Sequence, residues 1–295
     1  ADFSMGGGNY ANGSFIMNGG SIPGTILSDI ASKTGTTFVG GRANVDQTEL
    51  KQPRIALYKS WAANMDAGWI SLILERYGFN YHALTDADVK AGELHDSFDV
   101  IILPDQGTSS IVNGHRKGTM PPDYVGGITQ NGVENLRNFV EDGGTLICNK
   151  ASTDLAINYF DLPVKNILRG VPSESFSSPG SLLQMDYDTS HPLNNGLREN
   201  GMAYFSGGRV FEIETDSVET NGSNSNYSVY IAASYPDESL LISGWLIGEE
   251  KIRKKAAILD VNYGEGNIVL FGFNVHNRMQ SYANFKLLFN AFYYK

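Results

Sequence analysis

Cys148, the only cysteine of the chain, is the residue whose type and position could most directly do chemistry. It lies in GGTLICNKAST, residues 143–153, where a short apolar run leads into an expected helix start. Many α/β enzymes keep a nucleophile at such a junction. A nucleophile elbow needs small flanking residues, usually glycine, because its turn is strained. Cys148 is followed by Asn149 and Lys150 and lies inside the expected strand, so we expect a buried, unreactive thiol.

Other catalytic patterns are missing from the sequence. The five histidines form neither the His-x-x-Glu nor the His-Glu-x-x-His pattern of zinc hydrolases. A Gly-x-Ser-x-Gly elbow is absent, and the glycine-rich MGGGNYANG lacks the lysine and hydroxyl of a phosphate-binding loop. The sequence therefore predicts no catalytic residue, no metal and no cofactor.

Polar side chains follow four strands that we expect to be parallel neighbours. Ligands of open parallel sheets bind outside the carboxyl ends of the strands, so these side chains would gather at one rim. The predicted rim consists of Trp61, Asn64, Asp66, Asp105, Gln106, Asn149, Lys150, His276 and Arg278. It could form a polar pocket for a small or peptidic ligand. Alternatively, its members only cap helices and stabilise loops, as Asp66 and Ser152 would at expected helix N-termini.

The rim depends on a regular alternation of strands and helices after residue 53. Continuous apolar runs predict buried strands over 54–60, 79–84, 98–105 and 145–149. Amphipathic segments between and after them predict helices over 66–78, 86–92, 129–144 and 152–160, with Asp66, Asp86 and Ser152 or Thr153 as N-caps. This order predicts parallel strands joined by crossover helices.

After residue 161 the pattern changes to short strands separated by Gly, Ser, Asn and Pro turns. We expect strands over 181–187, 209–214, 227–234 and 239–246, then a hairpin formed by 255–261 and 266–273. A last helix over 281–294 carries Phe285, Leu288, Phe289 and Phe292 at helical spacing, which indicates a core-facing stripe.

The first 52 residues form a separate segment, rich in glycine and asparagine. It contains a helix signal over 23–35 and weak strand signals over 14–17 and 36–41, and residues 46–53 are expected to be a linker. The segment is too small to bury a core alone, so we expect it to pack on the main domain or to end a domain whose front is missing.

Composition excludes some classes of function. The 295 residues are 41% hydrophobic and carry a net charge of −10, which argues against a nucleic-acid partner because phosphate binding needs a basic face. No run approaches the ~20 apolar residues of a membrane helix. The chain begins with Ala1 and shows no signal peptide, so we expect a processed or truncated product.

Several blocks in order, among them RIALYKSWAANMDAGW, GVENLRNFVEDGGTLICNKAST and IVLFGFNVHNRMQSYANFKLLFNAFYY, resemble the region that follows the catalytic domain in bacterial zinc carboxypeptidase-like proteins. The resemblance covers residues 53–295, and YANGSFIM resembles the segment joining that region to the peptidase. It implies an α/β, flavodoxin-like, three-layer parallel sheet of the glutamine-amidotransferase-like type, with antiparallel strands added in the C-terminal half.

The resemblance also implies that the peptidase domain lies upstream as a partner and that the parent protein is exported. Active amidotransferases carry a Gly-x-Cys-x-Gly elbow, which LICNKAS lacks. In trehalose-utilisation-type relatives the same junction ends near a histidine, and the matching position here is Lys150. No catalytic residue therefore carries over to this chain.

Three hypotheses about function remain open. The first is a non-catalytic accessory domain that supports a carboxypeptidase or binds its peptide or glycan substrate. The second is a hydrolase or amidotransferase-like enzyme with Asp105, Lys150 or His276 as acid or base. The third is a carbohydrate-binding module that uses Trp61 and its polar neighbours.

Overall fold

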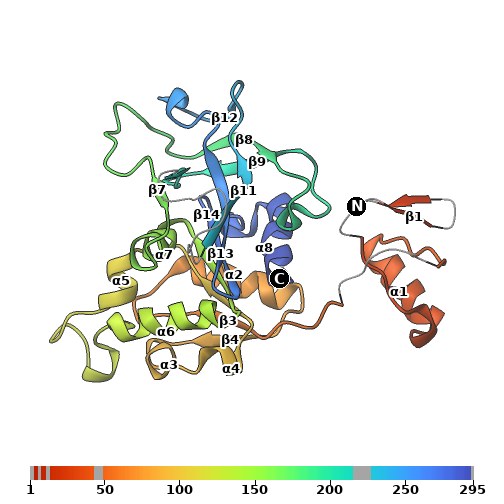
Figure 1. Ribbon diagram of the computed structural model, residues 1–295, viewed down its shortest axis with the longest axis horizontal. Coiled ribbons are helices and arrows are strands. Elements are labelled where there is room, and N and C mark those ends of the chain that lie inside the picture. The colour runs from red at the N-terminus through yellow and green to blue at the C-terminus, as the bar shows by residue number, and fades with distance from the viewer. Residues whose placement is uncertain (1–2, 6–7, 11–13, 43–48, 215–226, 294–295) are drawn as a thin grey trace. The chain divides into compact units, whose positions relative to one another are not determined.

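The computed structural model describes residues 3–5, 8–10, 14–42, 49–214 and 227–293 (Figure 1). By its internal contacts the chain divides into two compact units, Ala1–Leu50 and Lys51–Lys295.

The N-terminal unit contains a short hairpin and one regular helix. Strands β1 (Phe3–Met5) and β2 (Gly8–Tyr10) pair antiparallel, and α1 spans Gly24–Thr34. Gly35 ends α1 in the left-handed conformation, as the sequence predicts. The strands predicted over 14–17 and 36–41 are wrong, because these residues pair with no strand in the described part of the chain. The predicted linker begins outside the described residues.

The second unit is built on a mixed 12-stranded sheet with a parallel half. The spatial order β14-β6-β5-β3-β4 is parallel throughout. The four predicted rim strands are therefore parallel neighbours, as expected. Their bounds are β3 Ile55–Tyr58, β5 Val100–Leu103, β6 Thr145–Asn149 and β14 Gly266–Phe271, and β4, Tyr81–Leu84, forms the edge.

The other strands continue the sheet antiparallel from β14 through β13, β11, β8 and β12. β9 pairs with β8, and β10 joins β13 to β7. Figure 1 shows β8, β9 and β12 at the end of the sheet opposite β3 and β4. These strands are β7 Val164–Asn166, β8 Ser181–Tyr187, β9 Asn200–Phe205, β10 Phe211–Ile213, β11 Tyr227–Ser234, β12 Leu241–Ser243 and β13 Ala256–Tyr263.

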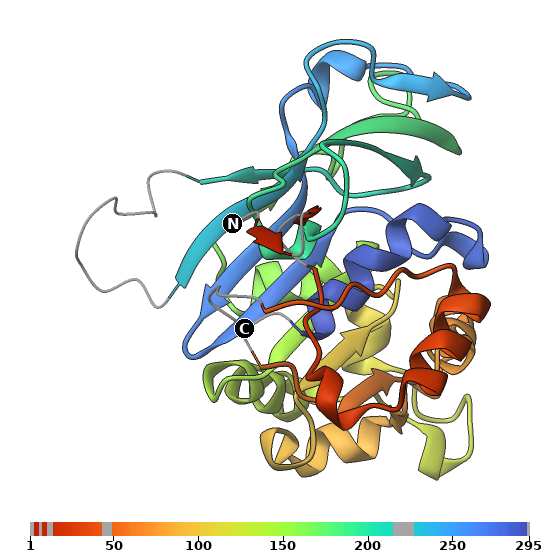
Figure 2. The same cartoon turned by 90° about the vertical axis from the view of Figure 1, so that its right-hand side faces the viewer.

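Helices cover both faces of the parallel half, which makes the unit three-layered (Figure 2). One core joins β-strand residues such as Leu57 and Ile147 to α2 (Met65–Arg76) and α8 (Phe285–Phe292). The other core, with Ala56 and Cys148, lies under the remaining helices. Burial on both faces explains why the parallel strands are continuously apolar. The remaining helices are α3 Asp86–Ala91, α4 Leu94–Ser97, α5 Thr108–Asn113, α6 Thr129–Glu141 and α7 Thr153–Tyr159.

Short 3₁₀ turns connect several of these elements. The described turns are Gly19–Ser21 (η1), Pro122–Tyr124 (η2), Lys150–Ser152 (η3), Pro192–Asn194 (η4), Glu249–Lys251 (η6), Asn277–Met279 (η7) and Tyr282–Asn284 (η8). Residues of η3, η7 and η8 line the candidate site. In the described part of the chain, no helix is long and apolar enough to cross a membrane.

The predicted caps of α2 and α3 are displaced by two residues and by one residue, respectively. Asn64, not Asp66, caps α2, since its side chain accepts a hydrogen bond from the Ala67 amide at 3.1 Å. Thr85, not Asp86, caps α3 in a capping box with Asp88. The correction matters for α2, because Asp66 lies inside the first turn and its carboxylate is not used as the cap.

Cys148 lies inside β6 and is fully buried. Burial raises the pKa of its thiol well above the usual range, so a thiolate is strongly disfavoured. The expectation of a buried structural cysteine is confirmed.

Candidate functional site

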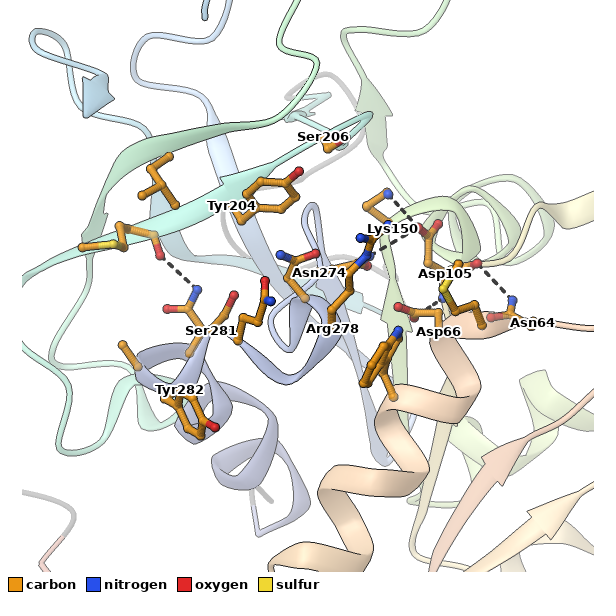
Figure 3. A pocket seen from close by; sticks show the side chains of 18 of the residues that line it. Asn64, Asp66, Asp105, Lys150, Tyr204, Ser206, Asn274, Arg278, Ser281 and Tyr282 are labelled. Atoms are coloured by element: carbon orange, nitrogen blue, oxygen red, sulfur yellow. Dashed lines mark hydrogen bonds and ion pairs between the residues drawn. The ribbon is translucent and has the colours of Figure 1, made fainter. Parts of the chain in front are cut away.

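A pocket of about 900 Å³ opens at the carboxyl ends of the parallel strands (Figure 3). Its floor comes from the first turn of α2, from Asp105 after β5 and from Lys150 after β6. Its other walls come from β9 and from the segment between β14 and α8. The pocket thus lies where the parallel and antiparallel halves of the unit meet at one end of the sheet.

Asp66 is held by two contacts that pin separate segments to the start of α2. Its Oδ1 accepts from His276 Nε2 at 2.7 Å, and its Oδ2 accepts from the Asp105 amide at 2.8 Å. Burial alone would raise the pKa of Asp66, but the hydrogen bond and charge of His276, the Asp105 amide and nearby Lys150 together lower it. Asp66 is therefore a carboxylate with both oxygens bonded inside the protein.

Asp105 and Lys150 form an ion pair in the pocket floor. Lys150 Nζ lies 2.6 Å from Asp105 Oδ2, and the two side chains are only 17% and 19% exposed. The Ala151 amide donates to Asp105 Oδ1 at 3.1 Å, and Asn274 Nδ2 lies 3.5 Å from Oδ2. Both oxygens of this carboxylate also have partners from the chain.

Lys150 occupies a tight turn between β6 and α7, with a left-handed backbone at φ 46°. A non-glycine residue in this region costs about 1–3 kcal/mol, so the surrounding contacts must hold it there. Asn149 Nδ2 and Ser152 Oγ both donate to the Leu103 carbonyl, and Ser152 Oγ accepts from the Asn149 amide. Ser152 is the N-cap residue of α7, one of the two predicted positions, but its hydroxyl makes no capping hydrogen bond and instead stabilises this turn.

The segment after β14 contains two further left-handed residues, Arg278 at φ 50° and Met279 at φ 57°. It is closed by the Met279 amide, which donates to the His276 carbonyl at 2.7 Å. Among the described residues, the Arg278 guanidinium has no ion pair or hydrogen-bond partner, and it lines the pocket (Figure 3).

The opposite wall comes from β9, which sequence reasoning did not connect with the rim. Met202, Tyr204 and Ser206 follow one another at a spacing of two, so alternate residues of this strand and its end line the pocket. Asn284 Nδ2 donates to the Met202 carbonyl at 2.9 Å and ties the wall to η8. The spacing was visible in the sequence, but nothing there places β9 beside the parallel strands.

The predicted rim residues separate into three groups. Five line the pocket: Asn64, Asp66, Asp105, Lys150 and Arg278. Gln106, Asn149 and His276 are buried beneath it, and His276 is 0% exposed.

The remaining rim residue, Trp61, does not line the pocket. It lies edge-on against Tyr124, with ring centroids 4.7 Å apart, and is 42% exposed. Trp69 lines the pocket instead. It lies three residues after Asp66, on the same side of α2, which is the signal that could have found it.

Two buried atoms of pocket-lining residues, Trp69 Nε1 and Asn274 Oδ1, have no hydrogen-bond partner among the described residues. Such groups cost about 1–3 kcal/mol when left unpaired, and a ligand or water can satisfy them. In the described ranges, no group of three or more His, Cys, Asp or Glu side chains could hold a metal ion. The arrangement favours binding of a polar molecule.

No protein-family model and no curated protein matches the sequence. Among solved structures, a ThuA-like protein from Bacteroides uniformis is similar over 85% of this chain and 94% of its own, with TM-score 0.46 and 11% identity. A GMP synthase-like protein from Thermoplasma acidophilum covers 83% and 94%, with TM-score 0.45 and 11% identity.

A β-galactosidase from Bacillus circulans is similar over 81% of this chain but only 30% of its own, with TM-score 0.47 and 12% identity. At this identity the likenesses concern the fold alone, and we draw no activity from them. None of these three proteins is a zinc carboxypeptidase.

Proposed function

We propose that this chain is a non-catalytic, ligand-binding domain whose pocket at the carboxyl ends of β3, β5 and β6 takes a small polar ligand. The observations that carry the proposal are the position of Lys150 in the chain and its ion pair. It occupies the strained strand-to-helix turn where this type of fold places a nucleophile, and its ammonium lies in an ion pair with Asp105.

The groups that could act as acid or base support the same proposal. His276 is fully buried, and its Nε2 hydrogen must point at Asp66, because an ionised carboxylate can only accept. Both oxygens of Asp66 and Asp105 are bonded within the protein. His276 is out of reach of a ligand, and the two carboxylates, although they line the pocket, have no oxygen without a partner for exchanging a proton with a substrate.

The wider role is an accessory one. We propose that the parent protein is exported and carries a zinc carboxypeptidase-like domain, for which this pocket binds or orients substrate. The resemblance of residues 53–295 in sequence is the support for this part.

Ligand-observed NMR with a panel of short peptides and oligosaccharides tests the binding function. We expect at least one compound to bind, and Tyr204→Ala to weaken it about tenfold or more because an aromatic wall of the pocket is lost. Lys254→Ala, at an exposed ion pair with Asp237 outside the pocket, is the matched control and should bind as wild type does. Wild-type protein that binds no member of the panel would overturn the proposal.

The enzyme hypothesis is tested in parallel with chromogenic ester, amide and glycoside substrates. We expect no turnover by wild-type protein. Turnover that disappears in Lys150→Ala but persists in Lys254→Ala would instead identify an enzyme that uses the lysine in the turn.

A further inference from the structure

We propose that the ligand of this pocket is an acidic saccharide whose carboxylate is bound by Arg278. This inference rests on the proposed binding function and goes further by naming the chemical class of the ligand.

The charges lining the pocket leave one cation without a partner. The lining residues include two carboxylates, Asp66 and Asp105, and two cations, Lys150 and Arg278. Asp105 pairs with Lys150, and Asp66 is bonded to His276 and to a backbone amide. Arg278 alone keeps all its donors free within the described structure. A planar guanidinium with free donors matches the two oxygens of a carboxylate.

The backbone that carries Arg278 is held in place at some energetic cost. Arg278 and Met279 are consecutive left-handed residues, and neither is glycine. Strained conformations of this kind persist only where surrounding contacts over-determine them, and they cluster at ligand sites. The contact that holds these two residues is made by His276, which precedes them in the chain and whose Nε2 lies 2.7 Å from Asp66 Oδ1. The hydrogen bond between Asp66 and the buried His276 therefore positions the segment that contains Arg278.

The rest of the lining favours a saccharide over a peptide. Trp69, Tyr204 and Tyr282 offer aromatic surface, on which the apolar faces of sugar rings pack. The side chains of Asn277, Gln280 and Ser281 have no hydrogen-bond partner among the described residues and can pair with hydroxyl groups.

One common mode of peptide binding is strand addition, which needs free backbone groups at a strand edge. On the wall strand β9 the Met202 carbonyl is already bonded to Asn284, so this group is not free to pair with a peptide. The volume of about 900 Å³ is at the upper end for small-molecule sites and is suited to more than one sugar ring.

Calorimetric titration tests the inference with oligomers of galacturonate, glucuronate and muramate, each paired with its methyl ester. We expect an acid to bind wild-type protein at least tenfold more tightly than its ester. Arg278→Gln should bring the affinity for the acid down to that for the ester, because glutamine keeps the length and polarity but not the charge. Arg198→Gln, an exposed arginine that does not line the pocket, is the matched control and should behave as wild type.

Three results would overturn the inference, and they separate it from the binding function. If an ester binds wild-type protein as tightly as its acid, the ligand carboxylate is not recognised, although the pocket still binds a saccharide. If peptides with a free C-terminus bind better than all the saccharides and lose affinity in Arg278→Gln, the ligand is a peptide and not a saccharide. If no acid binds while neutral sugars or peptides do, only the ligand class is wrong; if nothing binds at all, the proposed function falls too.

Discussion

Asp66→Asn tests whether the buried Asp66–His276 pair organises this end of the fold. The introduced amide would keep one carbonyl oxygen, which can still accept from the Asp105 amide. Its NH₂ group would then face His276 Nε2, which can accept only if the imidazole proton moves to Nδ1. That atom is buried and has no hydrogen-bond partner in the described part of the chain.

The substitution therefore removes one charge-assisted hydrogen bond and leaves one buried donor unpaired. Together these effects predict a loss of about 2–4 kcal/mol in the free energy of unfolding. Urea denaturation followed by tryptophan fluorescence measures it, since Trp69 lies in the same helix as Asp66. Asp237→Asn removes an exposed ion pair with Lys254 and should cost no more than about 1 kcal/mol.

The effect should depend on pH with a defined sign. The pKa of Asp66 is lower in the folded protein than its ordinary value of 3.8, so the unfolded chain takes up the proton first as the pH falls. The contribution of the carboxylate is thus complete above pH 3.8 and is lost below it, and the difference between wild type and Asp66→Asn should shrink there. A variant within about 0.5 kcal/mol of wild type at pH 7 would refute the role of the pair, given the cost expected for a lost buried hydrogen bond.

Three further predictions concern other parts of the second unit. Cys148 should react with a thiol reagent only at the rate of unfolding, and fast labelling of native protein would contradict its burial. Hydrogen bonds from Lys165 and Lys255 lower the pKa of Glu212 to about 2, so carboxyl NMR should show it ionised far below its ordinary 4.5. Its stabilising effect should be complete above pH 4.5 and should be lost progressively as the pH falls from there through about 2. Gly266→Ala should lower the free energy of unfolding by about 2 kcal/mol or more, since a Cβ there would lie 2.2 Å from the Val140 carbonyl oxygen. Gly68→Ala, on an open helix face, should instead raise it by about 0.5–1 kcal/mol. Thermal or urea unfolding measures both, and equal effects would contradict the packing described.

The sequence was sufficient to predict the parallel half of the sheet. Strands buried on both faces appear in the sequence as unbroken apolar runs, such as residues 100–103. In the segments between them, apolar residues recur at the spacing of a helix. The rule that ligands bind at strand ends then located five residues that line the pocket, among them Asp105 and Lys150. These are local signals, and each can be read within about ten residues of the chain.

Helix starts and the N-terminal strands were predicted less well. Asn64 and Asp66 both suit an N-cap, and in the folded chain Asn64 caps α2 while Asp66 bonds to His276, 210 residues later. The apolar residues at 14–17 suit a strand, but a strand forms only when another strand pairs with it.

What the tertiary structure alone decided is the other half of the pocket. Tyr204 and Ser206 come from an antiparallel strand whose place beside the rim depends on its pairing with β8. The free charge of Arg278 likewise could not be read from the sequence, because Asp105 had two cations within reach of the same rim and only the folded chain pairs it with Lys150. The sequence by itself determined which residues stand at the ends of the strands. Which of them are neutralised, buried or left free for a ligand depends on distances across the fold, since hydrogen bonds and ion pairs form between atoms that are close in space and not in sequence.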